Sequence, residues 1–215
     1  MTLSLNPFVL NTKKKNKPKS AIILCHGFGG NGKSFALLAN HWREKLTSTI
    51  FLCPTGPYKC IDKKDCFQWF DPTQEEKEII SQANNSSKKL DIFIHEVSKE
   101  YLIKEEKIII GGFSQGCMVA LQTGIMRKKS VKLIIGYSGK IIDEKMLSKN
   151  INSKPMISLF HGENDKIVSS KYLERARTFL ENRNFNINTK MFKNCDHKIP
   201  REGAKLGLEL IESLI

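Results

Sequence analysis

The sequence has no long apolar run, which argues against a membrane-spanning helix. Such a helix needs about 20 apolar residues in a row, and no stretch approaches that length. The first ten residues lack both a basic start and an extended apolar segment, so we expect no secretory signal. No repeat or linker divides the 215 residues, a length that suits one core. We therefore expect a cytoplasmic protein with a single domain over residues 1–215.

The six cysteines are scattered, with no spacing typical of a zinc site. Cys25, Cys53 and Cys117 lie in apolar segments, where a cysteine usually behaves as a small buried hydrophobic residue. Cys60 and Cys66 could bridge one loop, but a cytosolic protein keeps its thiols reduced, so we do not expect that disulfide. Because no cluster of metal ligands is visible, we predict no metal and no cofactor.

Acidic residues are the minority, and the formal net charge is +13. A basic chain suggests nucleic acid or an anionic membrane surface as a partner. The lysines are dispersed, apart from a cluster at 13–19, and no basic stretch is interleaved with aromatic residues. A composition rich in Lys, Asn and Ile throughout explains the charge, so we expect no nucleic-acid partner. Weak contact with an anionic membrane surface stays open.

Short apolar segments alternate with amphipathic ones along the chain. The expected strands cover residues 3–10, 20–25, 49–53, 108–110, 131–137, 155–160 and 187–192. The expected helices cover residues 34–46, 87–102, 117–126, 170–182 and 201–214, with a polar connection or short helix at 143–152. This alternation predicts an α/β fold with a mostly parallel central sheet, helices on both faces and no large cap domain. Ligand chemistry on such a sheet gathers at the carboxyl ends of the strands.

The segment from residue 54 to residue 85 is expected to be irregular. It carries three aromatic residues, Phe67, Trp69 and Phe70, in positions that look exposed. A long excursion of this kind in a compact domain is usually functional or disordered, and the aromatic residues argue against disorder. Because large aromatic side chains are costly to expose, the three either pack on the core or line an apolar groove. They are the candidate substrate-binding residues.

Gly112-Phe-Ser-Gln-Gly116 matches the pattern G-x-S-x-G between a predicted strand and a predicted helix. A serine in a strained turn at that place exposes its hydroxyl, and glycines two residues to either side remove side chains that would collide. The flanking strand and helix distinguish this motif from an ordinary loop in a parallel sheet. Ser114 is therefore the candidate nucleophile.

A serine hydroxyl needs a general base, usually a histidine that a carboxylate holds in one tautomer. In this type of fold the acid and then the histidine follow the serine along the chain. His197 follows the last predicted strand and is the candidate base, whereas His161 belongs to the turn that supports the acid. Asp165, just past a buried strand, is the preferred acid. Glu163 is the alternative, and Asp196 is disfavoured because adjacent side chains diverge.

Acyl transfer also needs two N–H donors for the developing oxyanion. The backbone N–H of Gln115, at the start of a helix, is one candidate. The glycine-rich loop after an early strand supplies the other, and we choose the N–H of Phe28. A phosphate-binding loop is the competing interpretation, because Gly32-Lys33-Ser34 follows Gly27. Its spacing is one residue short of that motif, which disfavours a nucleotide site.

Taken together, these motifs resemble the α/β-hydrolase superfamily, and within it the phospholipase/carboxylesterase group that includes acyl-protein thioesterases. The resemblance spans nearly the whole chain, and its motifs keep the family's order. The matching pieces are His26-Gly-Phe-Gly-Gly-Asn-Gly32, Trp69-Phe-Asp71, Gly112-Phe-Ser-Gln-Gly116, His161-Gly-Glu-Asn-Asp165 and Asp196-His197.

The resemblance implies Ser114 as nucleophile, Asp165 as acid and His197 as base. It also implies an oxyanion hole from Phe28 and Gln115, with Trp69 beside the acyl pocket. The chain departs from the family pattern at Gly30, where an aspartate is frequent, and at Cys117, where a glycine is frequent. These departures leave the three catalytic positions intact and bear on the substrate.

The expected function is hydrolysis of a small-molecule ester or thioester with a short-to-medium acyl chain, through an acyl-enzyme. Lysophospholipase activity, acyl-protein thioesterase activity and a hydrolase-fold binding protein without turnover are the alternatives. The pattern is compatible with a monomer or a homodimer.

Overall fold

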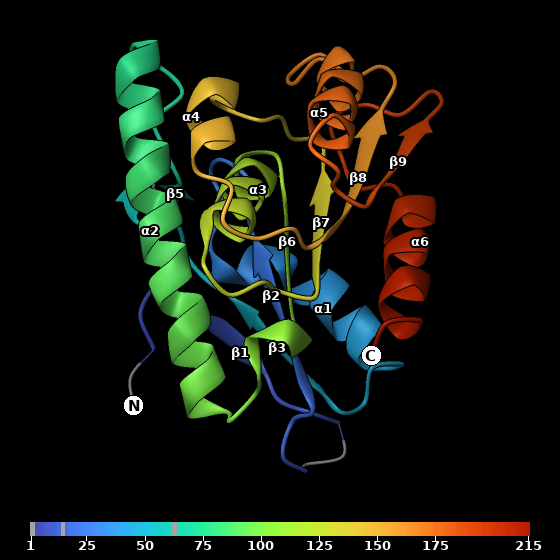
Figure 1. The fold of residues 1–215 in the computed structure, drawn as a ribbon. Coiled ribbons are helices and arrows are strands. Elements are labelled where there is room, and N and C mark those ends of the chain that lie inside the picture. The colour runs from blue at the N-terminus through green and yellow to red at the C-terminus, as the bar shows by residue number, and fades with distance from the viewer. Residues whose placement is uncertain (1–2, 14–15, 62–63) are drawn as a thin grey trace.

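A seven-stranded sheet forms the centre of the protein in the computed structural model, which describes residues 3–13, 16–61 and 64–215 (Figure 1). The strand order is β1-β3-β2-β6-β7-β8-β9. Strand β1 pairs antiparallel with β3, and the other neighbours are parallel. The strands are β1 Phe8–Leu10, β2 Ser20–Cys25, β3 Thr49–Cys53, β6 Ile108–Phe113, β7 Leu133–Tyr137, β8 Met156–Gly162 and β9 Ile187–Phe192.

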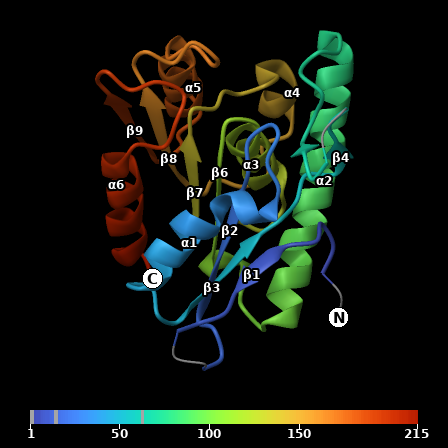
Figure 2. The same cartoon turned by 180° about the vertical axis from the view of Figure 1, so that it is seen from behind.

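Helices cover both faces of the sheet, as Figures 1 and 2 show from opposite sides. They are α1 Ala36–Arg43, α2 Glu76–Glu100, α3 Gln115–Met126, α4 Glu144–Lys149, α5 Lys171–Glu181 and α6 Arg201–Glu212, with the 3-10 turns η1 Gly32–Phe35 and η2 Glu105–Lys107. Because side chains alternate along a strand, β2 feeds two cores. Ile23 packs in a core with residues of α2, α3 and α5, and Ile22 packs in a core with residues of α1 and α6. The fold is that of an α/β protein with no large cap domain.

The expected parallel sheet and the order of its elements are confirmed, but several boundaries differ from those expected. Strand β1 covers only Phe8–Leu10. The first helical segment begins as η1 and becomes α-helical at Ala36. Two residues of the basic cluster, at 14 and 15, lie outside the described residues.

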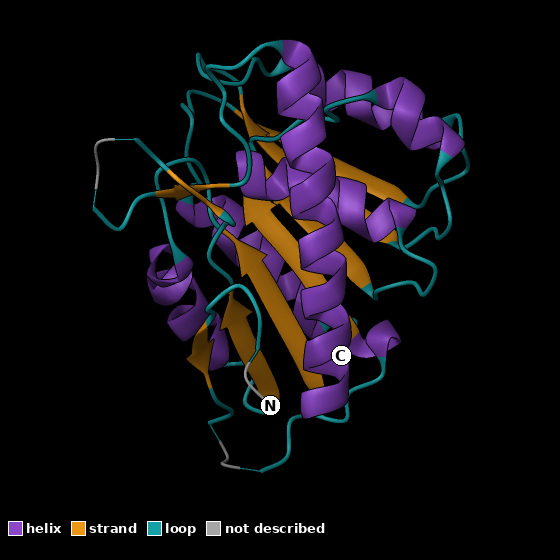
Figure 3. Cartoon of the chain, turned by 90° about the vertical axis from the view of Figure 1, so that its left-hand side faces the viewer, coloured by secondary structure: helices purple, strands orange, loops and turns teal. Residues whose placement is uncertain are grey.

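The prediction that residues 54–85 are irregular was wrong for part of this segment. Helix α2 begins at Glu76, eleven residues before the expected start, and runs along the sheet (Figure 3). The polar run Asn84 to Ser87 has low helix propensity, but tertiary contacts stabilise it. Ser86 donates a hydrogen bond to the carbonyl of Trp69, and Gln122 donates to the side chain of Asn84 at 2.6 Å.

A second, two-stranded sheet precedes α2. It consists of β4 Tyr58–Lys59 and β5 Phe67–Gln68, which pair antiparallel outside the main sheet (Figure 3). A disulfide between Cys60 and Cys66 closes this hairpin, with 5.3 Å between the Cα atoms. The expectation of two free thiols was therefore wrong. Sequence spacing alone does not show that the two strand ends come within bonding distance.

No helix among the described residues is long and apolar enough to cross a membrane.

Candidate active site

Ser114 occupies the turn between β6 and α3 in a backbone conformation that few side chains adopt. Its φ is +54° and its ψ is −119°, a costly conformation that persists only where its surroundings enforce it. The Ser114 N–H donates to the carbonyl of Tyr137 at 2.9 Å, and the N–H of Met118 donates to the Ser114 carbonyl at 3.1 Å. Strand β7 and helix α3 thus hold the turn in place.

The two flanking glycines allow the turn to close. A Cβ on Gly112 would lie 2.5 Å from the carbonyl carbon of Gly116. A Cβ on Gly116 would overlap the backbone carbonyl of Cys25 on β2. Because both obstacles are backbone atoms, no side-chain rotation relieves them, and α3 can start this close to the sheet only with glycine at both positions.

Asp165 follows β8 and carries a side chain with no exposed surface. Its Oδ1 accepts hydrogen bonds from the N–H groups of Ile167 at 2.9 Å and Val168 at 2.8 Å. Burial alone would raise the pKa of the Asp165 carboxyl, but hydrogen bonds from His197 and from these two N–H groups outweigh it and lower the pKa. Asp165 is therefore a buried carboxylate that stays ionised.

His197, in the loop after β9, contacts both the acid and the residue before Ser114. Its Nδ1 lies 2.7 Å from Oδ2 of Asp165. A carboxylate can only accept, so Nδ1 carries a proton, and the free lone pair of the neutral ring is then on Nε2. The imidazole also packs on Phe113, with 4.6 Å between the ring centroids. The base candidate therefore lies beside the Ser114 turn.

The other two acid candidates do not reach the histidine in this way. Glu163 and Asp196 are both exposed, and Glu163 accepts a long hydrogen bond from the N–H of Asn194 at 3.3 Å. Among the described residues, the carboxylate that contacts the His197 ring is that of Asp165.

His161 supports Asp165, the acid candidate, as its position next to the turn predicted. It lies within β8, and its Nε2 is 2.8 Å from the carbonyl of Val168 and 3.2 Å from Oδ2 of Asp165. Burial lowers the pKa of His161 despite the nearby Asp165 carboxylate. The neutral ring therefore donates its Nε2 proton into the loop that holds Asp165.

The loop after β2 comes close to Ser114. A Cβ on Gly27 would lie 3.4 Å from the Cβ of Ser114. The Gly30 N–H donates to the Gly27 carbonyl at 3.2 Å, which makes Phe28 a corner of this turn, with its side chain 55% exposed. No hydrogen-bond acceptor in the described part of the chain takes the N–H of Phe28 or of Gln115. For Gln115 this follows from its place in the first turn of α3.

His26 anchors that loop, a role that the sequence did not predict. The Gly56 N–H donates to His26 Nε2 at 2.8 Å, so the proton is on Nδ1, which is 2.7 Å from the Gly27 carbonyl. Burial lowers the pKa of His26, so the ring stays neutral in this bridge. The Nε1–H of Trp69 donates to the His26 carbonyl at 2.9 Å. The only sequence signal was a histidine directly before Gly27.

The three aromatic residues are less exposed than expected. Trp69 has no exposed surface, Phe70 is 6% exposed, and Phe67 is half-buried in β5. Trp69 packs beneath the loop after β2 and so contributes to the core. Of the two alternatives, packing on the core holds for Trp69 and Phe70, and a role for all three in an acyl pocket stays a prediction.

The side chain of Gln115 also has a second role that the motif did not reveal. Its Oε1 accepts the Trp69 N–H at 3.1 Å, and its Nε2 donates to the Phe70 carbonyl at 2.8 Å. The first residue of α3 therefore fixes the backbone that leads from the hairpin into α2.

The competing phosphate-loop motif forms a helix cap. Asn31 Oδ1 accepts the Lys33 N–H at 2.9 Å, and Ser34 Oγ accepts the Asn31 N–H at 2.9 Å. The Gly32 N–H donates to the Thr55 hydroxyl at 3.1 Å. The N–H groups of Asn31, Gly32 and Lys33 are therefore already bonded within the chain and do not point at a phosphate.

A parallel sheet with a strained serine between strand and helix defines the class of the protein: it is an α/β-hydrolase. The family model for phospholipase/carboxylesterase matches residues 6–214, and the chain belongs to that family. Esterases and thioesterases are among the proteins to which the chain is similar. This chain is a serine hydrolase that acts on ester or thioester bonds.

Two curated relatives illustrate the similarity. The chain is 29% identical to acyl-protein thioesterase 1 of Yarrowia lipolytica, over 91% of this chain and 89% of the relative. It is 26% identical to acyl-protein thioesterase 1 of Schizosaccharomyces pombe, over 100% of this chain and 99% of the relative.

Solved structures agree with this assignment. The crystal structure of esterase PE8 superposes with a TM-score of 0.93 at 27% identity and covers 100% of both chains. Acyl-protein thioesterase 2 of Zea mays has a TM-score of 0.78 at 20% identity, over 97% of this chain and 98% of that one, and supports the fold alone.

Proposed function

We propose that Ser114, His197 and Asp165 form a catalytic triad that hydrolyses esters or thioesters of short-to-medium acyl chains. The observation that carries this proposal is the 2.7 Å contact between His197 Nδ1 and Asp165, beside the strained Ser114 turn. We also propose that residues 1–215 work as a single domain. The cytoplasmic location and the monomeric or dimeric state stay predictions.

The proposed reaction has two steps. His197 Nε2 takes the Ser114 proton while Oγ attacks the acyl carbonyl, and the N–H groups of Phe28 and Gln115 stabilise the oxyanion. The tetrahedral intermediate collapses to an acyl-serine as His197 returns the proton to the departing alcohol or thiol. Water, deprotonated by the same nitrogen, then releases the carboxylic acid and regenerates Ser114. Buried Asp165 holds the tautomer and stabilises the imidazolium.

Replacing the nucleophile tests this mechanism. We expect Ser114→Ala to lower kcat by about 10⁴ or more, with the fold intact. Hydrolysis of a p-nitrophenyl ester, with circular dichroism to verify folding, measures the loss. Ser148→Ala is the control, because that hydroxyl donates to the Lys145 carbonyl within α4, away from Ser114 in sequence. A folded Ser114→Ala variant that keeps most of its activity would contradict the proposal.

A fluorophosphonate probe distinguishes this function from a binding protein on the same fold. An activated serine reacts with the probe, so we expect one label per chain, located at Ser114. A wild-type protein that neither labels nor turns over any ester would favour the binding function.

The acyl chain is the less constrained part of the substrate. Each methylene that is buried contributes about 0.8 kcal/mol, so kcat/KM should rise from acetate to medium chains and then level off. A series of p-nitrophenyl esters beside one thioester measures this preference. The relatives named acyl-protein thioesterase favour a thioester, and lysophospholipid is the alternative to include.

The variant Trp69→Ala separates two roles for this buried indole. An acyl-pocket role predicts lost chain-length preference with acetate hydrolysis nearly unchanged. Equal losses for all chain lengths would assign Trp69 to the fold, as its complete burial favours.

A further inference from the structure

We propose that the Cys60–Cys66 disulfide positions the loop after β2 for catalysis, so that a dithiol reductant lowers turnover of the folded enzyme. This inference rests on the proposed function, because it assigns an oxyanion donor to that loop. It assigns a positioning role in the reaction to Cys60 and Cys66, a pair of residues outside the triad.

The disulfide closes a hairpin of two very short strands. Strands β4 and β5 contain two residues each. The N–H of Cys60 donates to the carbonyl of Cys66 at 2.9 Å, next to the disulfide. An isolated two-stranded hairpin is marginally stable in water. The covalent bond therefore adds a constraint on the register of β5 at its Cys66 end.

Strand β5 is in turn bonded to the loop that carries Phe28. The Gly29 N–H donates to the Phe67 carbonyl, and the Phe67 N–H donates to the Gly30 carbonyl, both at 3.0 Å. These paired bonds make an isolated antiparallel bridge between Gly30 and Phe67. On the same side, Asn31 Nδ2 donates to the Asp65 carbonyl at 3.0 Å.

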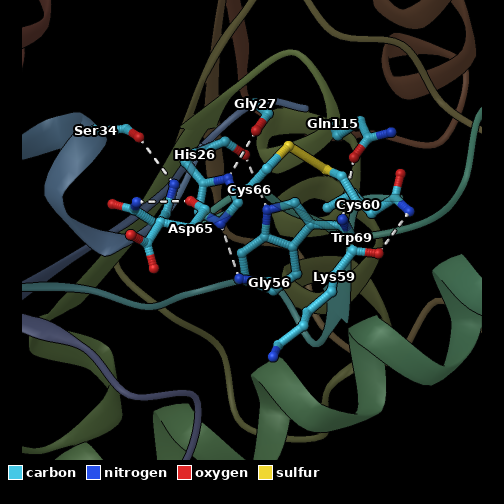
Figure 4. Close-up of a disulfide and its surroundings, with 12 residues drawn as sticks. His26, Gly27, Ser34, Gly56, Lys59, Cys60, Asp65, Cys66, Trp69 and Gln115 are labelled. Atoms are coloured by element: carbon cyan, nitrogen blue, oxygen red, sulfur yellow. Dashed lines mark hydrogen bonds between the residues drawn. A yellow bond between two sulfur atoms is a disulfide. The ribbon is translucent and has the colours of Figure 1, made fainter. Parts of the chain in front are cut away.

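Figure 4 shows the disulfide beside this loop. A Cβ on Gly29 would lie 3.7 Å from Sγ of Cys66, which is van der Waals contact. Gly29 itself has a φ of +80°, a conformation that glycine adopts easily and that leaves this segment pliable without its partner.

The loop is therefore held at two ends. The core holds His26 through Trp69 and Gly56, and the hairpin holds Gly29 and Gly30. Phe28 lies between the two attachments. If the hairpin end loosens, the N–H of Phe28 loses its fixed direction while the His26 end stays in place. A displacement of about 1 Å in a catalytic group can cost up to 10²-fold in rate.

Cys60 is the more accessible of the two bonded cysteines. Cys60 is half-buried and its neighbour Ile61 is 77% exposed, whereas Cys66 is 6% exposed. A dithiol thiolate attacks Sγ of Cys60, and Cys66 leaves as a thiolate that takes up a proton. The second thiol of the reductant then displaces Cys60 and forms a cyclic disulfide. The protein gains two hydrogens, and the reductant loses two.

The first experiment compares oxidised and reduced wild-type protein with a short p-nitrophenyl ester. Mass spectrometry after alkylation verifies that two further thiols have formed. We expect kcat to fall roughly tenfold on reduction, less than the 10²–10³ for complete loss of an oxyanion donor. We expect KM to change less than twofold and reoxidation to restore kcat. Unchanged kcat after verified reduction would overturn the inference.

Single and double variants distinguish the bond from the packing of either sulfur. If the bond matters, Cys60→Ser, Cys66→Ser and the double variant lose kcat equally and no longer respond to the dithiol. If packing of Cys66 on Gly29 matters instead, only variants at Cys66 lose activity, which contradicts the inference. Ile61→Ser, at the exposed tip of the same hairpin, is the control and should match wild type.

Active-site titration separates positioning from simple destabilisation. With a fluorophosphonate we expect every reduced chain to label, but with a rate constant that falls in parallel with kcat. A labelled fraction that falls in proportion to kcat would mean that the bond only supports folding, and would overturn the inference. Oxidised wild type that neither labels nor turns over would instead refute the proposed function itself.

Discussion

At the scale of single residues, burial decides which carboxylate can orient His197, the proposed base. Asp165 is buried, accepts two backbone N–H groups and faces both His161 and His197. Glu163, two residues away, is exposed. A solvated carboxylate on a mobile side chain cannot hold an imidazole in one orientation as firmly as a buried one that neighbouring N–H groups fix.

Replacing each acid by its amide should separate their roles. We expect Asp165→Asn to lower kcat about 10⁴-fold, because an amide allows the wrong tautomer and cannot stabilise the imidazolium. Glu163→Gln should change kcat less than threefold. Ester hydrolysis by the two purified variants measures both effects. The assignment of Asp165 is wrong if Glu163→Gln is the more damaging change.

At the scale of secondary structure, α3 has two roles. Its start carries the N–H of Gln115 that we propose as an oxyanion donor, and the Gln115 side chain bonds the backbone at Trp69 and Phe70. One turn of helix therefore couples the oxyanion position to the segment that joins the hairpin to α2. The hairpin, the loop after β2 and the start of α3 meet in this way at the carboxyl ends of β2 and β6.

Removing the Gln115 side chain should lower the free energy of unfolding more than removing a comparable side chain from the same helix. Gln115→Ala leaves the Trp69 N–H and the Phe70 carbonyl buried without partners, and each such group costs about 1–3 kcal/mol. Gln122→Ala, equally buried but bonded to the side chain of Asn84, should cost about 1 kcal/mol. Urea unfolding of both variants measures the free energy of unfolding. Equal losses would show that the Gln115 contacts contribute no special stability.

At the scale of the whole molecule, two buried histidines make stability depend on pH. Burial lowers the pKa of His26 and of His161 from the ordinary 6.5. When the pH falls below 6.5, the unfolded chain binds protons that the folded chain does not. The free energy of unfolding therefore decreases, by up to about 1.4 kcal/mol per pH unit for each ring, until the folded-state pKa is reached.

The variant His161→Gln should flatten this dependence. Glutamine keeps an N–H donor for the Val168 carbonyl but does not titrate. Between pH 7 and pH 5.5, urea unfolding should show a smaller slope than wild type, and the exposed His41→Gln should keep the wild-type slope. An unchanged slope in His161→Gln would contradict a lowered pKa for that ring. The folded-state pKa of Asp165 is also lowered. Below about pH 4, protonation of Asp165 therefore removes further stability from wild type and from His161→Gln alike.

The sequence by itself determined the strands of the main sheet, the order of the elements and the position of the Ser114 turn. These features depend on local patterns: the apolar runs Ser20–Cys25 and Ile108–Ile110, and the two glycines of G-x-S-x-G. They also follow the rule that loops at the carboxyl ends of parallel strands meet. Asp165 and His197 were predicted by that rule, and the structure brings their side chains into contact.

Only the tertiary structure decided which side chains are buried and which loops bond to each other. The sequence shows Trp69 in a polar, turn-rich segment, but its indole is buried because the loop after β2 folds over it. Helix α2 extends back to Glu76 because Ser86 and Asn84 find partners on distant segments. The Cys60–Cys66 bond forms because β4 and β5 pair, and that pairing depends on contacts between residues far apart in the chain. Local sequence patterns carry no information about such contacts.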